Sequence, residues 1–325
     1  MTTEPVAGPW ALPDARPTSA RERRGQWASF LLRSADVARA GRVFGPRLGG
    51  PPDVVSRSWF GHRLHVDVSR SLAQRLVFLL GERSLPEASV VRSLLAPGMV
   101  AVDVGANIGY WTLFLCSRVG TSGQVVAYEP SPENLPELEA NIARNGLAQV
   151  TVRPVAVGAR AGVVSFLSGI NGGVAEGDGG PHLCPVVTLD ELRDRPVDFV
   201  KIDVEGYEGA VLEGARELIR RQRPVLWIEF HPQLVRAHGF SYDALLGDLA
   251  PLYPRSRLFA SAEAASPGRL RRMASRYGLG RALVEVADPA GDGARALVAG
   301  QDAVWLCCDH GRGAEQNCRL SLPGA

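Results

Sequence analysis

The sequence is poor in lysine. Its cysteines also show no spacing that points to a metal centre. Lys201 is the only lysine, although the chain of 325 residues carries 36 basic side chains. The five cysteines are odd in number and show no C-x-x-C spacing, which argues against a disulfide framework and a zinc site. We therefore expect a reducing compartment, the cytoplasm.

A strong charge of one sign and long hydrophobic runs are also absent. The formal net charge is only +2, so the sequence does not favour a nucleic acid as partner. No stretch reaches about 18 apolar residues, and no membrane span is therefore predicted. The first 25 residues lack the apolar segment of a secretory signal.

Composition divides the chain into four predicted parts. They are a disordered leader (1–20), an accessory part (21–85), a main domain (86–310) and a tail (311–325). Within the accessory part, the patterns predict a basic helix in 21–45, a small hairpin over 59–68 and a helix over 71–83. The basic helix would pack on the main domain or on a second copy in a homodimer, with a membrane-surface or lid helix as the alternative.

The main domain alternates short apolar segments with amphipathic ones. The predicted strands cover 99–104, 124–129, 149–157, 163–167, 198–203, 224–230, 282–286 and 303–307. The predicted helices cover 108–119, a segment from a Ser131 cap to Gly146, a short one after a Thr188–Glu191 capping box, and 206–221. Segments 169–180 and 261–280 are expected to be irregular. Because apolar strands alternate with helices, the sequence predicts an α/β fold, a parallel sheet with helices on both faces.

One motif combines glycines with a carboxylate where a strand turns into a helix. It runs Asp103-Val-Gly105-Ala106-Asn107-Ile-Gly109. Its glycines would let the backbone approach a ligand, and the start of the helix offers free N–H groups. Asp103 would accept a hydrogen bond from a cationic amine. Glu129, at the end of the next strand, would suit the two hydroxyls of a ribose.

The spacing of these glycines distinguishes between cofactors. A dinucleotide site uses G-x-G-x-x-G, which admits a pyrophosphate, whereas Gly105 and Gly109 are spaced G-x-x-x-G behind an aspartate. A carboxylate disfavours a pyrophosphate and favours the ammonium and sulfonium of S-adenosylmethionine. We therefore predict a methyltransferase, with a nicotinamide (NAD) oxidoreductase and a non-catalytic scaffold of the same fold as alternatives.

Two polar clusters follow at the ends of later strands, the ends that face the ligand crevice of such sheets. They are Lys201, Asp203, Glu205 and Glu208 in the first, and Glu229 and His231 in the second. The first is either a helix start that favours acids, with Lys201 as counter-ion, or a site that needs a compact ammonium. His231 is a candidate proton acceptor or an ordinary loop histidine. His182, beside the glycine-rich segment, is a further candidate for substrate contact.

These segments resemble the FkbM family of methyltransferases. The similarity lies in MVAVDVGANIGYWTLFL, AYEPSPENLPELEANIARN, VTLDEL, VDFVKIDVEGYEGAVLEGA and PVLWIEFHP, and extends over residues 60–260 and the segment AVWLCC. The resemblance implies a class I (Rossmann-like) methyltransferase fold with a seven-stranded sheet whose last strand is antiparallel. It also implies methylation of hydroxyl groups on natural products, sugars or glycolipids.

The resemblance implies roles for individual residues as well. Cofactor contacts would come from Asp103, Gly105, Ala106, Asn107 and Gly109 at the methionine end, Glu129 at the ribose, and Pro130, Ser131, Ala156 and Val157 around the adenine. The catalytic candidates are Lys201, Asp203, Glu205, Glu229 and His231.

Together these observations predict an S-adenosylmethionine-dependent O-methyltransferase that acts on a small-molecule hydroxyl. An aliphatic hydroxyl is a weak nucleophile while it keeps its proton, and His231 or Asp203 is the expected base. A divalent metal held by Asp203 and its neighbours is the alternative. Substrate choice is expected to lie in the N-terminal part, the glycine-rich segment and 261–280.

Overall fold

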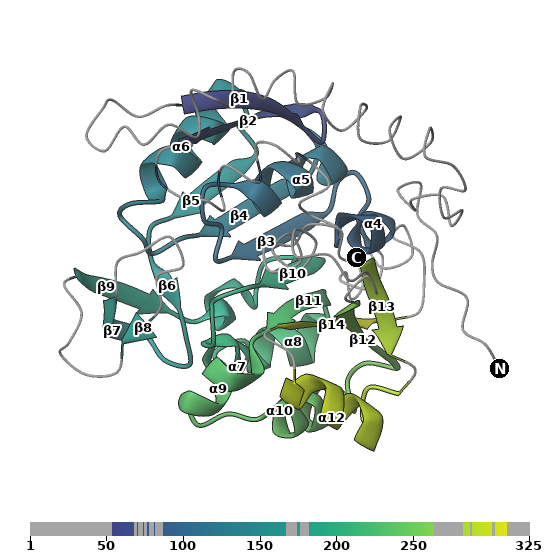
Figure 1. Ribbon diagram of the computed structural model, residues 1–325. Helices are drawn as coiled ribbons and strands as arrows, with labels where there is room; N and C mark the ends of the chain where they lie inside the picture. Colours follow the sequence, from purple (N-terminus) through teal and green to yellow (C-terminus); the bar gives the residue numbers. More distant parts are fainter. Residues whose placement is uncertain are drawn as a thin grey trace, which may run out of the picture.

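The computed structural model describes residues 54–67, 70, 74, 77, 81, 87–166, 174–175, 182–262, 282–286, 288–300 and 303–310. The expectations for 1–20, 21–45 and 311–325, and most of those for 71–83, 169–180 and 261–280, lie outside these residues. The described part is built around one eight-stranded sheet, shown in Figure 1.

The central sheet is mostly parallel. From edge to edge its strands are β13 (Ala282–Val286), β12 (Arg255–Ala262), β14 (Val304–Asp309), β11 (Val225–Phe230), β10 (Phe199–Ile202), β3 (Val100–Val104), β4 (Gln124–Tyr128) and β5 (Val150–Arg153). The five strands from β11 to β5 pair in parallel, whereas β14 is antiparallel to both β11 and β12. The class I methyltransferase fold with an antiparallel last strand is thus confirmed. The sheet has eight strands rather than seven because β13 pairs with the edge of β12.

Helices cover both faces of the sheet (Figure 1). One face carries the hairpin of β1 (Val54–Trp59) and β2 (His62–Asp67), α4 (Ala88–Val91), η2 (Arg92–Leu94), α5 (Tyr110–Val119) and α6 (Leu135–Arg144). The other face carries η3 (Leu189–Leu192), α7 (Glu208–Glu213), α8 (Arg216–Gln222), α9 (Pro232–Ala237), α10 (Tyr242–Leu249) and α12 (Asp292–Gly300). None of the helices in the described ranges is both long and apolar enough to cross a bilayer.

Each central strand contributes to two hydrophobic cores because its side chains alternate between the two faces. Leu226 and Ile228 of β11 belong to the core under α7, α8 and α10. Trp227, between them, belongs to the core under α5, where its ring lies 6.5 Å from that of Trp111. This double burial explains why the strands are apolar along nearly their whole length.

A second, smaller sheet interrupts the chain after β5. It consists of β6 (Ala156–Val157), β9 (His182–Val187), β7 (Gly162–Phe166) and β8 (Val174–Ala175). The predicted single strand 149–157 was wrong, because Pro154 separates β5 from β6 and proline cannot donate to a ladder. The strand predicted near 163–167 exists as β7, but in this smaller sheet.

Three helix boundaries differ from the predicted ones. The segment 206–221 forms α7 and α8 instead of one helix, and a side chain on the intervening Gly214 would lie 2.0 Å from the carbonyl oxygen of Gly158. Helix α6 begins at Leu135, because Ser131 Oγ accepts N–H groups within the preceding turn. Thr188 makes no capping hydrogen bond, so the predicted capping box is not formed.

Candidate active site

The predicted site residues gather where the parallel strands end. Asp103 lies in β3, one residue before the strand ends, Glu129 follows β4, Asp203 follows β10, and Glu229 lies near the end of β11. These four strands are consecutive neighbours in the sheet. Their carboxyl ends therefore form one edge, which is where ligands bind in open α/β sheets.

The turn after β3 makes a close backbone contact with the end of β10. Gly105 has a φ of +79°, and a side-chain carbon there would lie 1.9 Å from the carbonyl oxygen of Asp203. Its N–H and that of Ala106 both donate to the Tyr128 carbonyl oxygen at 3.0 Å. Asn107 has a φ of 51°, and Gly109, at the start of α5, a φ of +102°. Gly105 is thus required both by its conformation and by the lack of space for a side chain.

Glu129 fastens this turn to the one after β4. Its Oε2 accepts the Asn107 N–H at 2.6 Å, while Oε1 accepts the N–H of Ser131 at 2.9 Å and the Asn134 side-chain amide at 3.3 Å. Burial raises the pKa of Glu129, although these hydrogen bonds and the charge of Lys201 act in the opposite direction. A carboxylate offers about four acceptor positions, so the chain itself already uses most of them.

Asp103 is fully buried, yet one of its oxygens lacks a hydrogen-bond donor. Oδ2 accepts the Thr112 hydroxyl at 2.7 Å. Within the described part of the chain Oδ1 receives no hydrogen bond, and its nearest cation is Lys201 Nζ at 3.3 Å. A buried oxygen of this kind is suited to a cationic donor on a ligand.

Lys201 neutralises the centre of the edge. It is 1% exposed and pairs in register with Asp103 on one side and Trp227 on the other. Its Nζ donates to the Gly105 carbonyl oxygen at 2.9 Å and lies 3.4 Å from Asp203 Oδ2. Burial lowers the pKa of Lys201, but the carboxylates, Asp103 foremost, raise it further, and the net shift is upward. The ammonium is therefore hydrogen-bonded to the glycine turn.

His231 is held between two glutamates at the end of β11. Its Nδ1 lies 2.8 Å from Glu208 Oε1, and its Nε2 lies 3.4 Å from Glu205 Oε2. Burial would lower the pKa of His231, but the hydrogen bond to Glu208 and the charges of Glu229, Asp203 and Glu205 raise it to about 10. The imidazole is therefore charged at neutral pH in the ligand-free protein.

The neighbouring carboxylates crowd together. Burial raises the pKa of Glu205 even though His231 counteracts this shift. Glu229 has its pKa raised well above the usual range, by burial and then by Asp203 and Glu87. Glu87 lies directly before α4 and is buried. Carboxyl groups thus outnumber cationic side chains at these strand ends, an arrangement that favours a cationic ligand.

One group of side chains in the described residues has the spacing of metal ligands. Asp203, Glu205 and His231 each offer one ligand atom, and these atoms lie within 4.8 Å of one another. Oxygen and imidazole ligands of this kind suit several divalent cations.

The remaining predicted site residues lie in three different places. Pro130 and Ser131 lie beside Glu129 in the turn after β4. Ala156 and Val157 are buried in β6. His182 begins β9 of the smaller sheet.

Sequence reasoning missed several polar residues of the site. Glu208 was explained as a helix start, and Glu87 and Asn141 carried no local signal. Asn141 is fully buried, and its amide donates to the carbonyl oxygens of Ile108 and His65. Only the spatial contact between α6, the hairpin and the glycine turn reveals its place.

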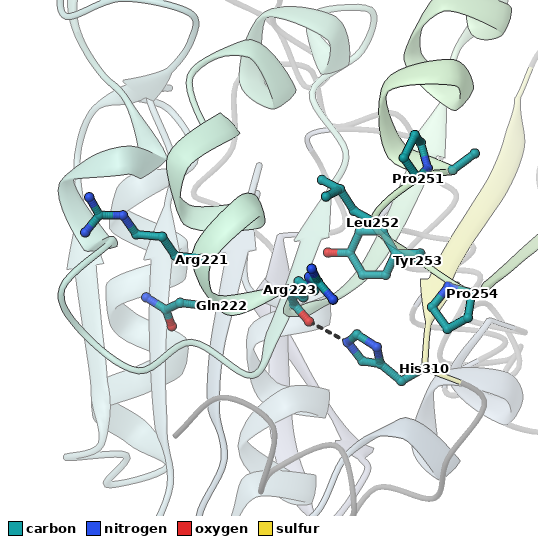
Figure 2. A pocket seen from close by; sticks show the side chains of 9 residues that line it. Arg221, Gln222, Arg223, Pro251, Leu252, Tyr253, Pro254 and His310 are labelled. Atoms are coloured by element: carbon teal, nitrogen blue, oxygen red, sulfur yellow. Dashed lines mark hydrogen bonds between the residues drawn. The ribbon is translucent and has the colours of Figure 1, made fainter. Parts of the chain in front are cut away.

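A hollow of about 540 Å³ lies elsewhere, as Figure 2 shows. It is lined by Arg221, Gln222, Arg223, Ala250, Pro251, Leu252, Tyr253, Pro254 and His310. These residues lie before β11, before β12 and after β14, at the edge opposite the strand ends described above. The hollow contains none of the predicted site residues.

Comparison with known proteins supports the assignment of the central region. Residues 103–249 match the model of the methyltransferase FkbM domain. No curated protein sequence gives a match.

Solved structures with similarity to the chain include several methyltransferases. A methyltransferase FkbM from Methylobacillus flagellatus is 23% identical, with a TM-score of 0.37, over 57% of this chain and about half (52%) of its own length. An S-adenosylmethionine-dependent O-methyltransferase from Thermotoga maritima is 17% identical over 81% of this chain and 79% of its own, with a TM-score of 0.38. A putative rRNA methylase from Clostridium thermocellum is 12% identical over 69% and 95%, with a TM-score of 0.37.

The family match and the strand order agree on the same region. The matched segment begins at Asp103 in β3 and ends at Leu249 of α10, so it contains the glycine turn, all four strand ends and His231. Residues 103–249 of the chain therefore form a region that matches the methyltransferase FkbM domain.

Proposed function

We propose that the protein transfers a methyl group from S-adenosylmethionine to a hydroxyl group of a small molecule. The supporting observation is that the backbone of Asp203 contacts the glycine turn of β3, while its side chain offers an oxygen within 4.8 Å of ligand atoms of Glu205 and His231. A cofactor on the turn would thus present its methyl group to a proton acceptor on the neighbouring strands.

The turn suits the cofactor at two points. Asp103 Oδ1 would accept a hydrogen bond from the ammonium group of the methionine part, and Glu129 would accept one from a ribose hydroxyl. When bound, S-adenosylmethionine supplies a methyl group on a positively charged sulfur, which is already activated for transfer. The residues around the turn have only to orient the two reactants and to remove a proton.

His231 is the proposed proton acceptor. Its Nε2 takes the hydroxyl proton while the acceptor oxygen bonds to the methyl carbon, and the electron pair of the broken carbon–sulfur bond stays on sulfur. The carboxylates that raise the pKa of His231 to about 10 also make it a strong base once it is neutral. Turnover should therefore rise with pH above neutrality.

A divalent cation is a second candidate for activating the hydroxyl. The spacing of Asp203, Glu205 and His231 favours it, because a cation bound there would acidify an oxygen ligand. The two mechanisms differ in one assay. Turnover that survives EDTA but is lost in H231A supports the base, whereas turnover that EDTA abolishes and Mg²⁺ or Mn²⁺ restores supports the cation.

Binding and turnover test the proposed function separately. Calorimetry should detect S-adenosylhomocysteine with wild-type protein and a loss of affinity of at least tenfold for E129A. A panel of hydroxylated small molecules, incubated with isotope-labelled cofactor, should yield methylated products by mass spectrometry. Methylation of RNA alone in a parallel reaction, or no affinity for S-adenosylhomocysteine, would overturn the proposal.

A further inference from the structure

Glu208 is a completely buried carboxylate in the segment that follows β10. It is 0% exposed at the first position of α7. Its Oε1 accepts the Gly206 N–H at 3.0 Å and lies 2.8 Å from His231 Nδ1. A buried carboxylate is unfavourable unless it is paired, and His231 is the partner that makes this one tolerable.

Packing fixes Glu208 independently of this contact. A side-chain carbon on Gly206 would lie 2.4 Å from Leu234 Cβ, and one on Gly209 would lie 2.3 Å from the Phe240 ring. Both contacts join α7 to α9 and the loop that follows it. The carboxylate is therefore held in place before any ligand arrives, which is what a positioning group requires.

The contact with Glu208 determines which ring nitrogen of His231 can face the acceptor hydroxyl. Glu208 Oε1 already accepts the Gly206 N–H, so the Nδ1 that faces the same oxygen is the donor of a second hydrogen bond. Nε2 is then the nitrogen left to face a ligand, and it points to the less buried side, 3.4 Å from Glu205. The same arrangement of carboxylate, imidazole and reacting group occurs in hydrolase triads.

We propose that Glu208 is a positioning residue that acts through His231, holding the ring by Nδ1 so that Nε2 meets the acceptor hydroxyl. This inference rests on the proposed methyl transfer. The competing explanation is an ion pair that only stabilises the packing of α7 against the end of β11. The two explanations differ in what happens to kcat when folding and cofactor binding are intact.

E208Q is the decisive variant, and E213Q is its matched control. Glu213 lies in the same helix, makes no side-chain hydrogen bond or ion pair with the described residues, and is not part of the site. We expect kcat of E208Q to fall about 100-fold, the scale of one general-base contribution. The KM for the cofactor and the Kd for S-adenosylhomocysteine should stay within twofold, and E213Q should match the wild type. A kcat of E208Q within twofold of the wild type would overturn the proposal.

A double-mutant cycle tests whether Glu208 works through the imidazole. In H231Q, the added E208Q substitution should change kcat less than twofold, because its target is gone. Losses that multiply in the double variant would instead show a structural role. If E208Q does not fold, E208D replaces it: its shortened carboxylate should lower kcat at unchanged KM, and an unaltered kcat would refute the proposal.

A spectroscopic measurement separates this inference from the function on which it rests. The Nδ1 proton of His231 should give a proton resonance far downfield of the amides in the full-length protein, without any substrate. The signal should disappear in E208Q and H231Q and persist in E213Q. Its persistence in E208Q would overturn the proposed contact, whereas wild-type protein that methylates no acceptor would refute the proposed function instead.

Discussion

Gly105 lies where the turn after β3 meets the end of β10, and two separate restraints act on it. Its φ of +79° is a conformation that side chains disfavour, and the space for a Cβ is taken by the Asp203 carbonyl oxygen. Gly146, which ends α6, shares the first restraint with a φ of +63° but has no heavy atom within 4 Å of the Cβ position. A comparison of substitutions at the two glycines therefore distinguishes the effect of backbone strain from that of steric overlap.

We predict that G105A is far more harmful than G146A. G146A should lower the free energy of unfolding by about 1 kcal/mol, the cost of a left-handed alanine. G105A should lower it by about 3 kcal/mol or more, since the turn must also move away from β10. It should abolish binding of S-adenosylhomocysteine as well. Urea unfolding and calorimetry check both, and equal effects of the two substitutions would contradict the close contact.

His231 should make stability depend on pH. Its folded-state pKa is raised from 6.5 to about 10, so the charged imidazole stabilises the fold fully below about 6.5 and this contribution is lost as pH rises towards 10. The difference in unfolding free energy between wild type and H231Q should shrink over that range by a few kcal/mol. Chemical unfolding at several pH values measures it, and a difference that grows with pH would contradict the sign.

At the scale of elements, the hairpin and α6 hold the glycine turn from outside the sheet. Asn141 of α6 donates from its amide to the Ile108 and His65 carbonyl oxygens, and its Oδ1 accepts the His65 N–H at 2.8 Å. One buried side chain thus links β2, α6 and the turn after β3. The hairpin is therefore part of the support of the candidate site.

N141A should weaken both the fold and the site. Loss of three buried hydrogen bonds predicts a decrease of about 2–4 kcal/mol in unfolding free energy, and the loosened turn should bind S-adenosylhomocysteine at least fivefold more weakly. N145A is the control, because Asn145 bonds the same hairpin through Arg63, but in an exposed position. It should cost less than about 1 kcal/mol and leave the affinity unchanged. If calorimetry gave N141A and N145A the same affinity for S-adenosylhomocysteine, the link between Asn141 and the glycine turn would be disproved.

The elements that local patterns predicted correctly are the ones with local causes. β3, β4, β10 and β11 are short apolar runs bounded by turns. The second strand of the hairpin is marked by its alternation, whereas β1 lies mostly before the predicted range 59–68. The split of 206–221 was missed, and Gly214 between the two helices packs closely against Gly158, a contact between residues distant in sequence. Strand β12 was also missed, because its pairing with β14 rather than its own pattern defines it.

At the scale of the whole molecule, topology explains why part of the site was predictable. Parallel neighbours bring Asp103, Glu129, Asp203 and Glu229 to one edge, so strand ends in the sequence become neighbours in space. Glu87 and Glu208 reach this edge through helices whose docking the sequence does not reveal.

The two ends of the parallel strands should differ in function. R221A changes an exposed arginine of the hollow opposite the strand ends, where it pairs with Glu217 and Asp194. Because exposed ion pairs contribute little, we expect stability within about 0.5 kcal/mol of the wild type, and affinity for S-adenosylhomocysteine and turnover within twofold. A tenfold loss of either would relocate the site.

The solitary amine at residue 201 has a practical consequence. An acylating reagent that modifies primary amines meets an enclosed, protonated group at Lys201 in the folded protein. Unfolding should add a single acyl mass, with no background from other lysines. The labelling rate would therefore report how often the structure around Lys201 opens, and a ligand bound at the glycine turn should lower this rate.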